Sequence, residues 1–222
     1  MGSFKVAEKF ISINGEARRA GELAVFIRFV GCDLRCTYCD TAWALLGDAP
    51  HELMDENEIY KYIKETGVKN VTLTGGEPLI QKDIKRLLLL LSEDENLRIE
   101  IETNGAEDIR PYKGISDRIS FTVDYKCPGS GMESRMEDEN FRTVDLKDSV
   151  KFVVMDRKDL IRMKEVIEEY RLCERTAVYV SCVFGAITPL EVVGFMKENS
   201  LNDVKLQLQM HKFIWNPEER GV

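Results

Sequence analysis

Three cysteines within eight positions carry the clearest chemical signal in the sequence. Cys32, Cys36 and Cys39 lie in GCDLRCTYCDTAW, residues 31–43, with the spacing Cys-x3-Cys-x2-Cys. Thiolates bind soft metals, and a site made only of cysteine normally takes four of them. The triplet therefore predicts a metal or cluster site that is one protein ligand short.

Three kinds of site could use this triplet. Structural zinc closes with four protein ligands, but a second cysteine pair is missing and His51 and His211 are too far apart for a His-x3–5-His pattern. A redox Cys-x2-Cys pair leaves Cys32 unexplained. An iron–sulfur cluster uses all three thiolates and leaves one iron open to an outside ligand. The spacing favours the cluster, with zinc as the alternative.

Two further loops at predicted strand ends carry residues suited to a ligand. The cysteine triplet follows the predicted strand 24–30. The next predicted strand, 71–75, ends in Thr74-Gly75-Gly76-Glu77-Pro78, and the third, 98–103, ends in Glu102-Thr103-Asn104-Gly105. Functional loops of parallel α/β sheets gather at the carboxyl ends of the strands. Paired glycines permit close backbone approach, and the acidic, hydroxyl and amide side chains bind polar groups. Together these loops predict one site, although Gly-Gly and Asn-Gly are also ordinary turns.

The elements that must position these residues alternate along the chain. Further strands are predicted at 118–124, 149–155, 177–184 and 204–210, all short and rich in Val, Ile or Phe. Amphipathic helices are predicted at 55–67, 81–95, 156–172 and 188–200, with N-caps Asp55, Asp156 and Thr188 and with Pro189 in a first turn. This alternation predicts an α/β fold with a parallel sheet and right-handed crossovers.

One domain spanning residues 1–222 is expected. Two segments stand outside the alternation: residues 1–23, which contain the loop SINGEARRAGE, and the polar excursion 126–148, which is either a lid or a passive surface loop. The sheet could curl towards a barrel, but 222 residues is fewer than the roughly 250 of a complete eightfold barrel.

Charge and hydropathy limit the kinds of partner and location that the protein can have. Lys plus Arg number 31 against 39 Asp plus Glu, a net charge of -8, which argues against a broad nucleic-acid or anionic-membrane surface. Apolar runs stay well below the roughly 20 residues of a membrane-spanning helix, and MGSFKVAEKF lacks a secretory apolar region, so a cytoplasmic protein is expected. Cys173 and Cys182 are expected to be buried, inert thiols, whereas Cys127 is given no role.

The cysteine spacing, followed by Gly-Gly-Glu-Pro after the next strand, resembles the radical S-adenosylmethionine superfamily. The resemblance implies that Cys32, Cys36 and Cys39 hold a 4Fe-4S cluster, whose fourth iron is chelated by the amino and carboxylate groups of S-adenosyl-L-methionine. It also implies reductive cleavage to a 5′-deoxyadenosyl radical, which abstracts a hydrogen atom from the substrate. The implied fold is a partial (β/α) barrel with a mostly parallel, curved sheet.

The flanking sequence narrows this resemblance to the 7-carboxy-7-deazaguanine synthase family. The matching stretches are FISINGE (10–16) with Gly21, FIRFVGC (26–32), YCDT (38–41) and LQMHK (208–212). The family resemblance implies magnesium-dependent conversion of 6-carboxy-5,6,7,8-tetrahydropterin to 7-carboxy-7-deazaguanine with loss of ammonia, in the biosynthesis of queuosine and other 7-deazapurines. It further implies an electron donor such as flavodoxin or ferredoxin, and a homodimer.

The same resemblance assigns roles by position. Thr41 would give an oxygen to Mg2+. Contacts to the cofactor are implied for Tyr38, Asp40, Gly75, Gly76, Glu77, Thr103, Asn104, Asp124, Tyr125 and Lys126. Contacts to the pterin are implied for Ile13, Asn14, Gly15, Glu16, Arg28, Thr74, His211 and the carboxylate of Val222. The fork of donors on Arg28 suits the substrate carboxylate, and one hydroxyl is a poor magnesium site, so magnesium is expected to need substrate oxygens.

Some features leave alternatives open. Asn14 stands where the family more often has Gln, Ala17 where a second glycine is common, and Met210 where Thr is usual, which affects the expected substrate contacts. An activating enzyme for a glycyl-radical partner would share the triplet and Gly-Gly-Glu-Pro but act on protein backbone. A non-catalytic, zinc-stabilised binding module is the other alternative. The Asn-Gly-Glu loop, Asp40-Thr41 and the Gln-x-His-Lys stretch favour the pterin.

Overall fold

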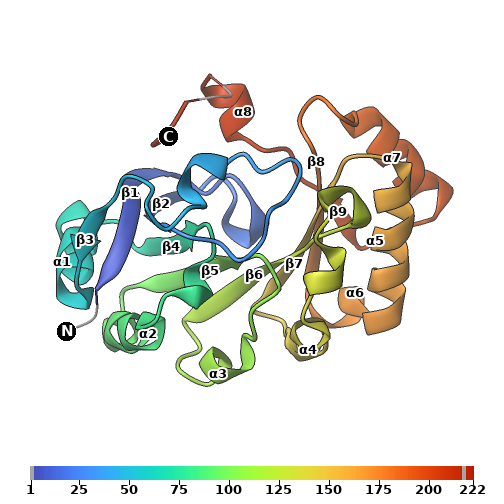
Figure 1. Cartoon of the computed structure of the whole chain (residues 1–222). Helices are drawn as coiled ribbons and strands as arrows, with labels where there is room; N and C mark the ends of the chain where they lie inside the picture. Colours follow the sequence, from blue (N-terminus) through green and yellow to red (C-terminus); the bar gives the residue numbers. More distant parts are fainter. Residues whose placement is uncertain (1–2, 217–218) are drawn as a thin grey trace.

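The computed structural model describes residues 3–216 and 219–222. Its strands are β1 Phe4–Ile13, β2 Leu23–Phe29, β3 Glu52–Met54, β4 Asn70–Gly75, β5 Arg98–Thr103, β6 Ile119–Tyr125, β7 Ser149–Val154, β8 Ala177–Cys182 and β9 Val204–Leu206. They form one nine-stranded sheet in the order β3-β1-β2-β4-β5-β6-β7-β8-β9. The sheet is curved and does not close; the α-helices before residue 200 lie along its outer side, whereas the last one, α8 His211–Ile214, lies over its open side (Figure 1). The predicted α/β, partial-barrel fold is confirmed.

Seven strands of this sheet are parallel, as predicted. These are β2 and β4 to β9, joined in order. The structure differs from the prediction in β1 and β3, which were not predicted, and in β8 and β9, which end earlier than predicted. β1 pairs antiparallel with β2 and β3, and was not predicted because its residues alternate poorly between polar and apolar, so pairing with β2 decides its conformation. β9 ends at Leu206, four residues before its predicted end.

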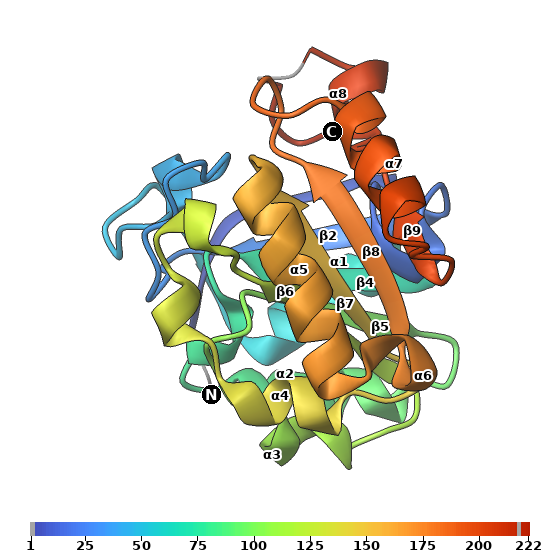
Figure 2. The same ribbon diagram turned by 90° about the vertical axis from the view of Figure 1, so that its right-hand side faces the viewer.

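The four predicted helices are confirmed as α1 Glu56–Thr66, α2 Ile84–Glu93, α5 Arg157–Tyr170 and α7 Pro189–Glu198. Asp55, Asp156 and Thr188 cap α1, α5 and α7 by accepting hydrogen bonds from first-turn backbone amides, whereas Asp83, the N-cap residue of α2, makes no such bond. Short helices were not predicted: α3 Arg110–Lys113, α4 Asp138–Thr143, α6 Leu172–Arg175, α8 His211–Ile214 and the 3-10 turns η1 Ala17–Arg19, η2 Ala42–Ala44, η3 Pro78–Ile80, η4 Pro128–Ser130 and η5 Glu133–Arg135. Figure 2 shows α5 and α7 on the outer side of the sheet. Within the described ranges, none of the helices is long and apolar enough to cross a membrane.

The two faces of the sheet have different chemistry. Towards the helices, strand residues such as Ile27, Leu73, Ile101, Val123, Phe152 and Val180 are fully buried in the hydrophobic core. The strand register aligns polar residues on the opposite face, where Arg28 lies beside Thr74, Glu102 beside Thr122, and Asp124 beside Lys151. Buried polar residues need partners or a ligand. The inner, polar face is therefore where a site can form.

The polar segment 126–148 is packed into the fold. It contains η4, η5 and α4, and its residues Cys127, Ser130, Asn140 and Phe141 are fully buried. The Asn140 amide binds backbone groups of residues 105, 107 and 109 after β5. The segment also contacts the cysteine loop, because Thr37 donates hydrogen bonds to the carbonyls of residues 129 and 130.

Candidate functional site

The cysteine triplet lies in the loop after β2, at the carboxyl end of the strand. Cys32, Cys36 and Cys39 are partly exposed free thiols. Arg35 braces the loop by donating to the carbonyls of Cys32, at 2.7 Å, and Leu34, at 2.6 Å. Burial raises the pKa of Cys32 and raises the pKa of Cys36 to about 11, so these thiols are protonated at neutral pH. Binding a metal or cluster must therefore release protons.

Three soft thiolates in one short loop are a donor set that fits an iron–sulfur cluster. Cys32 Sγ accepts a hydrogen bond from the backbone N–H of Leu34, and Asn104 Nδ2 lies 3.6 Å from it. Hydrogen bonds to the ligating sulfur tune such a cluster. Over the described part of the chain, no group of three or more His, Cys, Asp or Glu is arranged to hold a metal ion.

The paired glycines after β4 bring that strand against the cysteine loop. A Cβ on Gly75 would lie 2.3 Å from the carbonyl oxygen of Phe29, and a Cβ on Gly76 would lie 1.9 Å from that of Gly31. The next residue, Glu77, donates its backbone N–H to the Gly31 carbonyl at 2.8 Å. The close approach that the sequence predicted at these glycines is made to the chain itself, and it fixes the start of the cysteine loop.

Glu77 joins the ends of two neighbouring strands. Its side chain is fully buried and accepts hydrogen bonds from Leu79 N at 2.9 Å, Thr103 Oγ1 at 2.9 Å and Asn104 N at 2.7 Å. Burial raises its pKa to about 7, although these hydrogen bonds oppose the shift. In the structure this carboxylate holds the end of β5 beside the cysteine loop, and its contact with S-adenosyl-L-methionine stays a prediction.

A row of alternating charges crosses the polar face. Lys126 donates to Asp124 at 2.7 Å, Lys151 Nζ lies 3.7 Å from the same carboxylate, and Lys151 also pairs with Glu16. Burial disfavours the charge on Lys151, but Glu16, Asp124 and Glu102 raise its pKa well above the usual value, so it stays protonated. The sequence predicted Asp124, Lys126 and Glu16 but missed Lys151. The signal for it was a single cation within the apolar strand SVKFVV.

Several buried polar atoms beside this row have no hydrogen-bond partner. They are Glu16 Oε1, Asn14 Nδ2, Asp124 Oδ1, Ser12 Oγ and Ser181 Oγ. A buried polar group without a partner costs about 1–3 kcal/mol, so such groups are expected to serve a ligand. They include both donors and acceptors. Their ligand should therefore carry a polar edge with both kinds of group.

The N-terminal loop meets the C-terminal segment at this place. A Cβ on Gly15 would lie 3.6 Å from His211 Nδ1, and Asn14 Oδ1 accepts from Thr72 on β4 at 2.8 Å. Burial lowers the pKa of His211, so it is neutral at pH 7. Ile13 ends β1 opposite Leu23. Four of the residues predicted to bind the pterin, Asn14, Gly15, Glu16 and His211, are thus brought together.

Arg28 and Thr74 lie on the same polar face and already have partners. Arg28 Nε donates to Glu8 Oε1 at 2.7 Å, and Thr74 Oγ1 donates to Glu102 at 2.8 Å. Burial raises the pKa of Glu102, and raises that of Glu100 to about 7. Glu100 and Glu102 were not predicted as a pair, although the alternation in RIEIET places both side chains on one face of β5.

Other predicted residues lie at the margins of this region. Thr41 Oγ1 is 3.3 Å from Asp40 Oδ1 and 3.8 Å from Cys39 Sγ. Tyr38 donates to the Val153 carbonyl on β7 at 3.1 Å, and burial raises its pKa. The Tyr125 side chain faces the helices, packed against Phe141 and Phe152 and bound to Glu133, so only its backbone can reach the polar face. Val222 is half-buried, and Arg220 stacks on Trp43 at 4.3 Å just after Thr41, which brings the chain end beside the cysteine loop.

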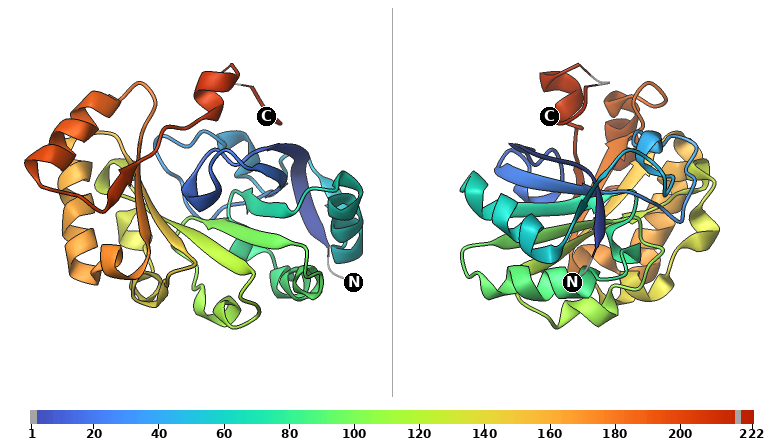
Figure 3. Two further views of the ribbon diagram at one scale, coloured as in Figure 1. Left: turned by 180° about the vertical axis from the view of Figure 1, so that it is seen from behind. Right: turned by 60° about the vertical axis from the view of Figure 1, so that its left-hand side comes forward.

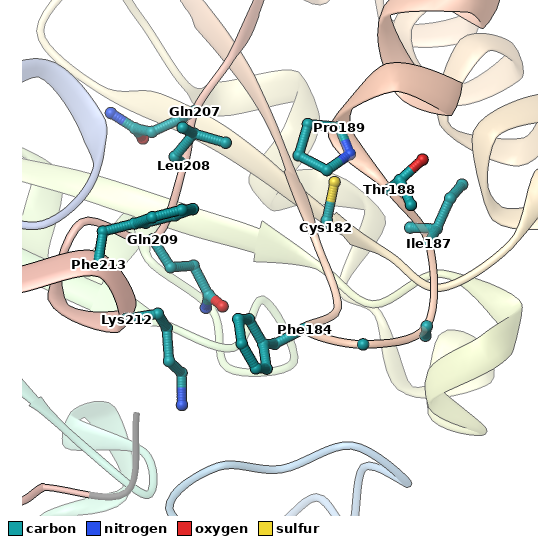
Figure 4. Close-up of a pocket in the computed structure, with 12 residues that line it drawn as sticks. Cys182, Phe184, Ile187, Thr188, Pro189, Gln207, Leu208, Gln209, Lys212 and Phe213 are labelled. Carbon is teal, nitrogen blue, oxygen red and sulfur yellow. The ribbon is translucent and has the colours of Figure 1, made fainter. Parts of the chain in front are cut away.

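A separate apolar cavity of about 230 Å³ lies at the carboxyl ends of β8 and β9 (Figure 4). Its lining residues are Cys182, Phe184, Gly185, Ala186, Ile187, Thr188, Pro189, Gln207, Leu208, Gln209, Lys212 and Phe213. None of the side chains that the sequence assigned to the site lines this cavity. The residues that the sequence assigned to the site lie instead on the polar face and in the cysteine loop.

Comparison with known proteins agrees with this geometry. Residues 26–125, from β2 to β6, match the family model of the Radical SAM superfamily. A 7-carboxy-7-deazaguanine synthase from Clostridium acetobutylicum is 55% identical over 220 residues, which is 99% of this chain and 100% of that protein. One from Leptospira interrogans is 35% identical over 98% of this chain and 97% of its own length. The crystal structure of QueE from Escherichia coli matches with a TM-score of 0.71, 19% identity and 93% coverage of both chains, which shows a shared fold. The chain therefore belongs to the 7-carboxy-7-deazaguanine synthase family of the radical S-adenosylmethionine superfamily.

Proposed function

We propose that this chain is a 7-carboxy-7-deazaguanine synthase, a lyase that converts 6-carboxy-5,6,7,8-tetrahydropterin to 7-carboxy-7-deazaguanine with loss of ammonia, in queuosine and 7-deazapurine biosynthesis. The observation that carries the proposal is the set of unpartnered donors and acceptors on the polar face, beside a loop of three thiols. The full-length likeness to synthases of that name supports the choice of reaction.

The residues present fit the cofactors of the superfamily. Cys32, Cys36 and Cys39 would hold the 4Fe-4S cluster, and the chain offers no fourth thiol in that loop, which leaves room for S-adenosyl-L-methionine. When bound, the cluster and S-adenosyl-L-methionine together supply the radical chemistry. Asn104 contacts Cys32, while the Asp124–Lys126 pair places a fixed charge pair near Cys36.

The polar face fits a pterin. Glu16 Oε1 can accept from ring nitrogens and Asn14 Nδ2 can donate to a ring acceptor. Lys151 pairs with Glu16 and holds its carboxylate in place. Arg28 suits the substrate carboxylate, which must share this guanidinium with Glu8.

Magnesium is proposed at Thr41, with Asp40 beside it. A hard cation prefers several oxygen ligands, and Thr41 and Asp40 supply few, so the substrate should supply the others. Magnesium affinity should therefore rise when the pterin is present. A titration that gives equal affinity with and without pterin contradicts this assignment.

Anaerobic reconstitution tests the whole proposal. The protein should take up iron and sulfide and, with S-adenosyl-L-methionine, reductant and the carboxy-tetrahydropterin, release 7-carboxy-7-deazaguanine, detected by mass. Conversion of a glycyl-radical enzyme in place of the pterin would favour the activating-enzyme alternative, and zinc without iron would favour the binding module.

The remaining partners are proposed by analogy with the family. A flavodoxin or ferredoxin is proposed as the electron donor, and the protein is proposed to act in the cytoplasm as a homodimer. Replacing the chemical reductant by either donor should sustain turnover. Sedimentation of the reconstituted enzyme should give twice the mass of the 25.5 kDa chain.

A further inference from the structure

In the N-terminal loop, residues 14–22, the backbone of Ala17 is bound by the side chain of Gln207, which lies near the other end of the chain. Ala17 N donates to Gln207 Oε1 at 2.6 Å, and Gln207 Nε2 donates to the Ala17 carbonyl at 3.2 Å. One carboxamide thus satisfies both backbone polar groups of a residue 190 positions away. Figure 3 shows the N-terminal loop in blue beside the C-terminal segment in red.

The held residue has a conformation that it would not adopt alone. Ala17 has φ +59° and is buried. Residues other than glycine rarely occupy this left-handed region, so surrounding contacts must maintain the conformation of Ala17. The pair of hydrogen bonds from Gln207 does so.

The two residues beside Ala17 also contact distant parts of the sheet. Glu16 pairs with Lys151 on β7, and Arg18 Nε donates to the Asp148 carbonyl at 2.9 Å. At the other end of the loop, Asn14 binds Thr72 on β4. The loop therefore spans the open side of the sheet, from β4 to β7 and to the end of β9.

Gln207 is itself firmly placed. It directly follows β9, and its backbone N–H donates to the Val180 carbonyl on β8 at 2.9 Å. The sheet therefore fixes the position from which its side chain reaches the loop.

We propose that Gln207 is a positioning residue for the substrate: by holding Ala17 it keeps the adjacent Glu16 carboxylate on Lys151, with Asn14 and Gly15 beside His211. The inference rests on the proposed function, because it takes the pterin as the ligand of this loop. Gln207 acts through Ala17 and makes no contact with the reacting atoms in this scheme.

Hydrogen exchange of the protein without cofactors tests the holding role directly. Gln207→Ala should speed amide exchange of the peptide 14–22 by about tenfold, the change expected when about one net hydrogen bond is lost. Gln207→Glu keeps the acceptor for Ala17 N but faces the Ala17 carbonyl with a carboxylate, and should give an intermediate rate. Asn202→Ala, an exposed amide on the same edge of the sheet, is the matched control and should leave the rate unchanged. Unchanged exchange in both Gln207 variants overturns the proposal.

Steady-state kinetics of the reconstituted enzyme separate positioning from general damage. Gln207→Ala should raise KM for the pterin by about tenfold while kcat and substrate-free cleavage of S-adenosyl-L-methionine change less than about twofold. An equal fall in kcat and in substrate-free cleavage, or an unchanged KM, contradicts the positioning role. If the wild-type enzyme does not convert the pterin at all, the proposed function fails, and the exchange experiment still decides whether Gln207 holds the loop.

Discussion

Two buried carboxylates on the polar face, Glu100 and Glu102, have pKa values that burial raises. Glu100 and Glu102 follow each other at alternate positions of β5, and each accepts a hydrogen bond from a threonine, Thr122 at 2.6 Å and Thr74 at 2.8 Å. Burial and the proximity of Glu102 raise the pKa of Glu100 to about 7. Ionising it in the folded protein is therefore unfavourable, and this makes stability depend on pH.

Glu100→Gln should remove part of that pH dependence. The folded protein holds the Glu100 proton up to about pH 7, whereas the unfolded chain releases it near its ordinary pKa of 4.5. The free energy of unfolding should therefore fall as pH rises from about 4.5 to 7, by about 1–3 kcal/mol from this group. The variant keeps an acceptor for Thr122. Its free energy of unfolding, measured with urea on the protein without cofactors, should change less between about pH 4.5 and 7 than that of the wild type. Glu95→Gln, at an exposed position, should match the wild type. A slope that persists in Glu100→Gln means that other groups cause it.

Ala17→Gly should stabilise the protein. A left-handed conformation costs an alanine about 1 kcal/mol more than a glycine, while glycine loses more entropy on folding, so a net gain of about 0.5 kcal/mol is expected. The backbone contacts with Gln207 stay possible. The neighbouring Ala20→Gly is the control with the opposite sign, because Ala20 has φ -51° and glycine there only adds chain entropy. Urea midpoints that shift in the same direction for both variants would contradict this account.

Part of the candidate site could be predicted from residue spacing, because the position of a loop directly after a strand can be read from the sequence. The cysteine loop and the Gly-Gly-Glu stretch come directly after strands, so the parallel arrangement of the strands brings them together. Lys151 and Gln207 were missed because their importance comes from partners far away in the chain, Glu16 and Ala17. Side chains such as Tyr125 cannot be assigned to a face from spacing at a strand end, where the register of the neighbouring strands decides.

At the scale of elements, the contact between the ends of β2 and β4 determines where the cysteine loop begins. Gly76 N donates to the Phe29 carbonyl at 3.1 Å, and Glu77 N donates to the Gly31 carbonyl at 2.8 Å. The sequence predicted both strands from short apolar runs and the four long helices from amphipathic runs, because the apolar residues follow the pattern of each kind of element. β1 and the short helices were not predicted, since tertiary contacts and not their own patterns stabilise them.

Gly76→Ala should disrupt this contact. Its Cβ would lie 1.9 Å from the Gly31 carbonyl oxygen and 2.9 Å from the Cys32 Cβ, so the backbone must shift, at a cost of about 1–3 kcal/mol. The displaced loop should bind less iron on reconstitution. Gly114→Ala is the matched control, because an added Cβ there meets no atom within 4 Å. Iron per chain, measured by a colorimetric assay, should fall only in the first variant, and equal iron in both would show that the loop tolerates the shift.

At the scale of the whole molecule, the sheet keeps its core and its chemistry on opposite faces. The hydrophobic core joins the outer face of the strands to α1, α2, α5 and α7, and Cys32, Cys36 and Cys39 lie outside it and are partly exposed. The polar face instead depends on charge pairs such as Lys151 with Glu16 and on the loop that closes the open side. The hydrophobic core and the predicted cofactor site thus use different sets of residues.

Removing the cluster should therefore leave the fold in place. A structural metal site supplies the folding free energy of small metal-dependent domains, which unfold when a chelator is added. In this chain the core is built without Cys32, Cys36 and Cys39, so the protein stripped of iron by an anaerobic chelator should keep its far-ultraviolet circular dichroism and unfold in one cooperative urea transition. Its midpoint should be lower than that of the loaded protein only by the linkage contribution of the bound cofactor. Loss of the helical signal on chelation would mean that the metal stabilises the fold, as in the zinc-stabilised binding module, and would remove the ground for treating the cysteine loop as a catalytic attachment to an independent core.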